Sequence, residues 1–128
     1  MGNMKREDLC KIRMEHIAEN FRQLQPAFIA LGDETRQQII IALLLSDHNG
    51  IRVGEITSKT HLSRPAVSHH LKTLKDAGIV NMRREGTMNY YYVDADESQW
   101  KQIMELTKYV YEVARDISEN GSCRKAEE

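Results

Sequence analysis

The sequence predicts a mainly helical α+β fold in which a two-stranded hairpin follows a group of helices. Apolar residues recur at helical spacing over most of the chain, and helix-capping residues precede several of these stretches. A β-rich segment around a glycine interrupts the helical pattern late in the chain. The 128 residues, of which 41% are hydrophobic, suit one globular domain over residues 1–128.

Helices are predicted on both sides of Pro26. Residues 5–24 carry apolar side chains near helical spacing among charged neighbours, which is typical of an amphipathic leading helix. Pro26 interrupts this pattern, and Asp33 is a favourable N-cap for a second helix. Residues 39–45 form the longest uninterrupted apolar run of the chain, and we expect them to be deeply buried in that helix.

Two further helices complete a predicted helical core over residues 33–78. Residues 53–60 predict a short helix, and after a two-residue turn Ser63 is the N-cap of the next helix. Pro65 is tolerated in the first turn of that helix, where its missing N–H has no intrahelical partner to lose. Gly78 ends the helix because glycine readily adopts the left-handed conformation of a C-terminal stop.

The periodicity changes between residues 79 and 93. β-rich residues at both ends of this segment flank Arg83, Arg84 and a glycine turn, which predicts a two-stranded hairpin with both arginines at its tip. Residues 98–118 return to a helical pattern with a broad apolar stripe and predict a last helix. Residues 119–128 form a tail that we expect to fray.

This order of helix, helix, tight turn, helix and hairpin is typical of a winged helix-turn-helix. In that architecture the second helix of the pair enters the major groove of DNA, and the hairpin forms a wing. The apolar residues of the helix after Ser63 should face the core, namely Val67, Leu71 and Leu74. The opposite side then carries hydrogen-bond donors and no carboxylate, namely Arg64, Ser68, Lys72 and Lys75.

The charge of the chain is unevenly distributed. The formal net charge is −1, yet residues 51–93 hold seven Lys and Arg against three Asp and Glu. This positive segment coincides with the predicted helix-turn-helix and wing, which favours double-stranded DNA as a partner. Residues 94–128 hold five basic against nine acidic residues. The acidic segment keeps a second interpretation open, a winged-helix module that binds proteins and binds DNA only weakly.

The candidate DNA-binding residues divide by chemistry. Arg64 suits guanine, Ser68 and His69 are short or planar groups that reach base edges, and lysines suit phosphates. Arginines in the wing suit backbone or minor-groove contacts. The full predicted set is Ser63, Arg64, Pro65, Ser68, His69, Lys72, Lys75, Arg83 and Arg84. An ordinary solvated helix face is the alternative explanation for the polar side of a single helix.

The sequence gives no support to a membrane protein or to an enzyme. The longest apolar run is far shorter than the roughly 18 residues that cross a bilayer, and the chain begins without an apolar signal core. We therefore expect a cytoplasmic protein with no membrane partner. The sequence also lacks a nucleophile elbow, an HExxH motif and a phosphate-binding glycine loop, so we expect no catalytic residues.

The run LSRPAVSHHLKTLKDAGIV, residues 62–80, resembles the recognition helix and wing of the ArsR/SmtB family of bacterial winged-helix repressors. The likeness extends upstream through residues 28–39 and downstream through residues 83–86 and the tyrosines that follow. It implies a homodimer whose interface consists of the leading and last helices of both chains. It also implies that two recognition helices read an inverted repeat.

The two well-known metal sites of this family are absent from the sequence. One is a Cys-x-Cys-Asp arrangement at the start of the third helix, where this chain has Arg52, Val53, Gly54 and Glu55. The other uses Asp and His on the last helix, and no histidine follows position 70. His69 and His70 are adjacent on a helix, so we expect one ring toward DNA and one packed. We expect no metal and no cofactor.

Cys10 and Cys123 are candidate thiol sensors. If the terminal helices pack as the resemblance implies, the two thiols approach each other within or across the dimer. Two functionally unrelated thiols near the chain ends are the alternative. The sequence therefore leaves open a small-molecule or redox effector and does not identify one.

Overall fold

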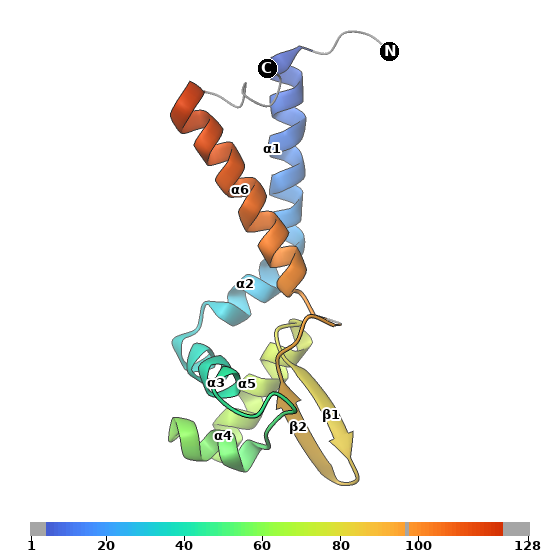
Figure 1. Cartoon of the computed structure of the whole chain (residues 1–128), viewed down its shortest axis with the longest axis vertical. Helices are drawn as coiled ribbons and strands as arrows, with labels where there is room; N and C mark the ends of the chain where they lie inside the picture. Colours follow the sequence, from blue (N-terminus) through green and yellow to red (C-terminus); the bar gives the residue numbers. More distant parts are fainter. Residues whose placement is uncertain (1–4, 97, 122–128) are drawn as a thin grey trace. The chain divides into compact units, whose positions relative to one another are not determined.

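The computed structural model describes residues 5–96 and 98–121 (Figure 1). The chain divides into two compact units. The core unit consists of residues 25–101, and the paired-helix unit consists of the remaining residues at both ends of the chain. Each unit has its own internal organisation, and the core unit carries the predicted helix-turn-helix and wing.

Four helices build the core unit, namely α2 (Gln25–Leu31), α3 (Glu34–Leu44), α4 (Val53–Thr60) and α5 (Arg64–Asp76). Helices α3, α4 and α5 pack on one another. Their fully buried side chains include Ile39, Ile56, Val67, Leu71 and Leu74. The three apolar residues predicted to anchor α5 are therefore confirmed as core.

The predicted helix caps form. Asp33 accepts a hydrogen bond from the backbone N–H of Arg36 at 2.9 Å, and the Ser63 hydroxyl accepts one from Ala66 at 3.3 Å. Each cap satisfies one of the N–H groups that the first turn of a helix leaves without an intrahelical acceptor. Gly78 follows α5 with a φ of +76°, as a glycine stop requires. Both helices therefore begin where their sequences predict.

The first half of the chain differs from expectation in two respects. The leading helix ends before Pro26 as predicted, but Pro26 itself lies in the first turn of an unpredicted short helix, α2, where a missing N–H costs little. The run of residues 39–45 is only partly buried: the side chains of Ile41, Leu44 and Leu45 are 53%, 55% and 81% exposed. A helix on a core presents one face inward, so a continuous apolar run necessarily leaves some members outside.

Arg36 joins α2 to α3. Its Nε donates to the carbonyl of Ala30 at 2.8 Å and its Nη2 to the carbonyl of Ile29 at 3.1 Å. These carbonyls belong to the last turn of α2, where few backbone N–H groups remain as donors, and that of Ile29 also accepts from the backbone N–H of Gly32 at 3.2 Å. The guanidinium therefore satisfies the end of one helix from the first turn of the next.

The hairpin pairs β1 (Asn81–Glu85) with β2 (Met88–Tyr92) in antiparallel register. Gly86, at a φ of +62°, lies in the turn between them. Arg83 and Arg84 lie within β1 rather than at the tip, opposite Tyr90 and Asn89 respectively, so the predicted placement is wrong. Two charged residues at the tip would have required strands two or three residues shorter.

The paired-helix unit contains α1 (Arg6–Gln23) and most of α6 (Trp100–Asn120). The two helices cross in Figure 1 and are joined where Arg13 donates to Asp116 at 3.0 Å. The Asp116 side chain is only 6% exposed and that of Arg13 is 29% exposed, so the ion pair is partly buried. The leading and last helices are thus confirmed near their predicted bounds, and no described helix is both long and apolar enough to cross a membrane.

Candidate nucleic-acid interface

One face of α5 and its N-cap is polar and exposed, while the opposite face is buried. The exposed residues include the whole predicted set on this helix, namely Ser63, Arg64, Pro65, Ser68, His69, Lys72 and Lys75. The amphipathic spacing explains this division, because residues three and four apart share a face. The structure therefore presents these side chains together on one accessible surface.

That surface includes a carboxylate, contrary to the sequence-based expectation. Lys72 Nζ lies 2.8 Å from Asp76 Oδ2, one helical turn away. The hydrogen bond from Lys72 lowers the pKa of Asp76, and the same bond raises the pKa of Lys72. Asp76 follows Lys72 at the four-residue spacing that places two residues on one face of a helix, so it belongs to the same surface. Asp76 consequently offsets one of the two lysine charges at the C-terminal end of α5.

His69 and His70 point in different directions. The His69 side chain is exposed, whereas His70 is half-buried with its Nδ1 3.5 Å from Arg36 Nη1. Adjacent helical residues diverge by about 100°, which accounts for the difference. The structure thus has one exposed and one partly buried ring, as expected, and contact of His69 with DNA stays a prediction.

The two hairpin arginines differ in their surroundings. The Arg83 guanidinium lies over the Tyr90 ring at 4.8 Å from its centroid, and its Nε donates to Glu85 at 3.0 Å. Arg84 is exposed, and its Nε donates to the carbonyl of Gly86 at 3.0 Å. Successive residues of a strand point to opposite faces, so Arg84 shares the face of its pairing partner Asn89.

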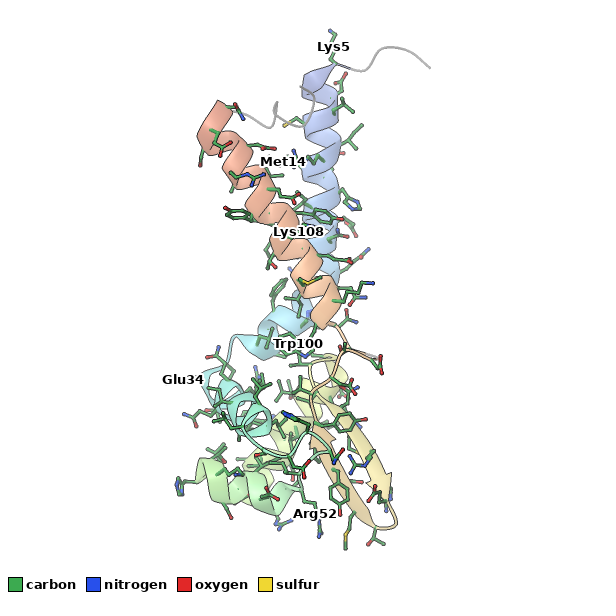
Figure 2. All side chains as sticks on the ribbon, in the orientation of Figure 1. Lys5, Met14, Glu34, Arg52, Trp100 and Lys108 are labelled. Carbon is green, nitrogen blue, oxygen red and sulfur yellow. The ribbon has the colours of Figure 1, made fainter. Side chains whose placement is uncertain are left out.

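A groove of about 470 Å³ opens between the starts of α4 and α5 and the hairpin turn. It is lined by Arg52, Val53, Gly54, Glu55, Arg64, Thr87, Met88 and Asn89. Figure 2 labels Arg52 at this place, between the first turn of α4 and the hairpin. Only Arg64 of this set was predicted as a site residue. Arg52 carried a usable signal, because it lies in the positive segment directly before a predicted helix.

The described residues contain no group of three or more His, Cys, Asp or Glu side chains suited to a metal ion. At the start of α4, the two positions that the family resemblance would give to thiolates are Arg52 and Gly54. Cys10 lies on α1 and is half-buried, and Cys123 lies outside the described residues. The predicted thiol pair therefore stays a prediction.

Comparison with known proteins identifies the family. The family model for bacterial regulatory proteins of the arsR family matches residues 33–82. The chain is 37% identical over 95 residues to an HTH-type transcriptional regulator of Methanocaldococcus jannaschii, covering 74% of this chain and 99% of that protein. It is 31% identical over 100 residues to the transcriptional activator HlyU of Vibrio cholerae, covering 78% of this chain and 88% of HlyU. It is 36% identical over 64 residues to the transcriptional repressor SdpR of Bacillus subtilis, covering 50% and 68%.

Solved structures agree with this assignment. An ArsR-like transcriptional regulator from Rhodococcus sp. RHA1 is 25% identical, with a TM-score of 0.64 and coverage of 79% of this chain and 89% of that one. The helix-turn-helix with its capped α5, the hairpin and the relatives together decide the class: the chain belongs to the ArsR family of transcriptional regulators, which are DNA-binding winged helix-turn-helix proteins and not enzymes.

Proposed function

We propose that this protein is a homodimeric repressor that binds an inverted-repeat operator in the cytoplasm. The observation that carries the proposal is the exposed polar face of α5, which rests on an opposite face that is fully buried. A rigidly seated helix holds its side chains at fixed positions, as base recognition in the major groove requires.

The proposed contacts follow the chemistry of each side chain. Arg64, Ser68 and His69 read base edges, since they occupy the first turns of α5 and are exposed. Lys72 and Lys75 contact phosphates, where position matters less than charge. In the wing, Arg84 contacts the DNA backbone, and Arg83 contributes through the hairpin that it stabilises.

Exposed apolar side chains on the terminal helices support the dimer. Leu9 and Ile12 on α1 are 42% and 51% exposed, and Met104 and Tyr111 on α6 are 58% and 64% exposed. Apolar patches of this kind on a small chain favour association. A two-fold dimer then presents two copies of α5, and its symmetry requires an operator with two inverted half-sites about one helical turn apart.

Repression is the proposed direction of control. The relatives include the repressor SdpR and the activator HlyU, so the family alone does not set the sign. A dimer that covers a promoter excludes other proteins from it, so the dimer has to leave the DNA before transcription can start. A reporter gene behind the upstream region should therefore be more active when this protein is deleted. Lower activity on deletion would make it an activator.

The decisive experiment is fluorescence anisotropy of the reduced protein on a DNA fragment from upstream of its own gene. Competition with unrelated DNA at fixed salt measures specificity, and we expect a ratio of at least about 10³. A ratio near one, together with retained dimerisation, would favour the protein-binding module instead. Repeating the titration after mild oxidation tests the proposed role of Cys10 and Cys123. Oxidised protein that binds equally well would exclude them as sensors of oxidants.

A further inference from the structure

The groove at the start of α4 brings two guanidinium groups to one place. Arg52 precedes α4 and Arg64 begins α5, and both side chains are exposed and line the groove. A Cβ atom at residue 54 would lie 3.2 Å from Arg64 Nη2, so glycine at this position leaves room for the Arg64 guanidinium against α4. Twelve residues separate the arginines in sequence, and the helix-turn-helix fold joins them.

Within residues 5–96 and 98–121, no carboxylate neutralises either of these two charges. Among the described residues, Arg13, Arg22, Arg36 and Arg83 each have a carboxylate partner within 4.0 Å. No ion pair joins Arg52 or Arg64 to any described carboxylate, although Glu55 lines the same groove. An exposed pair of unpaired guanidinium groups attracts an anion, and arginine suits the geometry of a phosphate in particular.

We propose that Arg52, at this groove, binds a phosphate of the DNA backbone as a DNA-contacting residue that precedes the recognition helix, while Arg64 beside it reaches a base edge. The inference rests on the proposed DNA-binding function. The groove lies between two elements that both face DNA in that proposal, the first turn of α5 and the hairpin turn. A duplex that touches both elements passes over the groove, and each of its strands carries a phosphate about every 3.4 Å.

Glu55 allows a second test, because its removal and the removal of Arg52 should change DNA affinity in opposite directions. Its carboxylate lines the groove and repels a phosphate there, so its removal should strengthen DNA binding while removal of Arg52 weakens it. A variant that merely damaged the fold would weaken binding in both cases. Opposite effects from two residues of one groove therefore report the charge of the bound group.

The experiment compares Arg52→Gln, Glu55→Gln and Lys59→Gln by anisotropy on operator and random DNA across a range of salt. We expect Arg52→Gln to weaken binding to both DNAs by one common factor and to reduce the slope of log K against log salt by about 0.9. Its relative loss should shrink about threefold between 50 and 200 mM salt. Glu55→Gln should tighten binding to both DNAs.

Lys59→Gln is the matched control. Lys59 is an exposed residue of the same helix and lines a different cavity, with Ile41 and Leu45. Its loss removes the same single charge away from the groove, so a clearly smaller change of slope is expected. Arg52→Lys should keep the wild-type slope, because the charge remains.

Each other outcome overturns the proposal in a distinguishable way. If the wild type binds its operator specifically but Arg52→Gln and Lys59→Gln show equal slopes of log K against log salt, only the proposed phosphate contact is overturned. A second outcome is that inorganic phosphate stabilises the DNA-free wild type but not Arg52→Gln, while the variant binds DNA as the wild type does. The groove would then be a site for free anions and not for DNA. A wild type that does not bind its upstream DNA specifically, at any salt, refutes the proposed function itself and this inference with it.

Discussion

Arg83 and Arg84 are adjacent in sequence, but the pleat of β1 turns them to opposite faces of the hairpin. The Arg83 guanidinium lies over the Tyr90 and Tyr92 rings and bonds Glu85, so it already has an intramolecular carboxylate partner. Arg84 bonds only the carbonyl of Gly86 among the described groups and keeps further N–H donors for a partner. We therefore propose that Arg83 stabilises the hairpin and that Arg84 contacts DNA.

Arg84→Gln should weaken binding to all DNA sequences and lower the salt slope by about one, because one phosphate contact is lost. The variant should melt at the wild-type temperature. Arg83→Gln should instead destabilise the hairpin by about 0.5–1 kcal/mol through loss of the cation–π contact. Anisotropy at several salt concentrations and thermal unfolding check the two variants. A reduced slope for Arg83→Gln with unchanged melting would contradict this division.

Arg64→Ala and His69→Ala should relax base discrimination, each at the base pair that the side chain reads. The expected loss is about 1–3 kcal/mol on the operator and much less on random DNA. Binding to a library of single-base operator variants locates the affected position. Lys75→Ala is the comparison, since a phosphate contact should weaken all library members equally. Uniform loss for all three variants would contradict base reading by Arg64 and His69.

At the scale of single elements, the helix caps connect stability to pH. The hydrogen bond from the backbone N–H of Arg36 to Asp33 lowers the pKa of that carboxyl below its ordinary value. A lowered pKa in the folded state means that ionised Asp33 stabilises the fold above the unfolded pKa of about 3.9. This contribution is lost as the pH falls through the folded pKa.

Asp33→Ala should therefore destabilise the protein at neutral pH, and the difference from wild type should shrink as the pH falls below about 3.9. Asp33→Asn keeps a capping acceptor that does not titrate, so it should retain most of the stability at neutral pH without this dependence. Urea unfolding at a series of pH values measures both. A pH-independent loss for Asp33→Ala would show that the charge of the cap is irrelevant.

At the scale of the whole molecule, the proposed dimer explains the exposed apolar residues of α1 and α6. These residues lie on the helices that the family resemblance assigns to the interface, whereas the exposed apolar residues of α3 lie on the core unit. The two sets allow a matched comparison. Each substitution replaces an exposed aliphatic side chain by a carboxylate, and only one set is proposed to meet a second chain.

Ile12→Glu should raise the dimer dissociation constant by at least about tenfold, because a carboxylate would be buried without a partner. It should also weaken operator binding, since two half-sites are no longer held by one dimer. Leu45→Glu, at an 81% exposed position of the core unit, should leave both properties unchanged. Sedimentation velocity gives the association state. An Ile12→Glu protein that stays dimeric would place the interface elsewhere.

Most of the elements could be predicted because their signals are local. The predicted helix over residues 53–60 matches α4, and Asp33 and Ser63 cap the helices that they were expected to cap. Helix α2 was missed because Pro26 is compatible both with a break and with a first helical turn, and nearby residues do not distinguish the two. The position of the arginines in the hairpin depended on strand length, which cross-strand pairing sets.

The order of elements, the buried face of α5 and the candidate residues on its outer face follow from local sequence patterns, because periodicity and capping depend on residues a few positions apart. Tertiary packing is needed to see that Arg52 shares a groove with Arg64 and that Arg83 lies over two tyrosine rings. The groove combines residues 52–55, 64 and 87–89, which meet only when α4, α5 and the hairpin pack together. Local sequence patterns do not predict contacts between residues so far apart in the chain, and the groove is formed by such contacts.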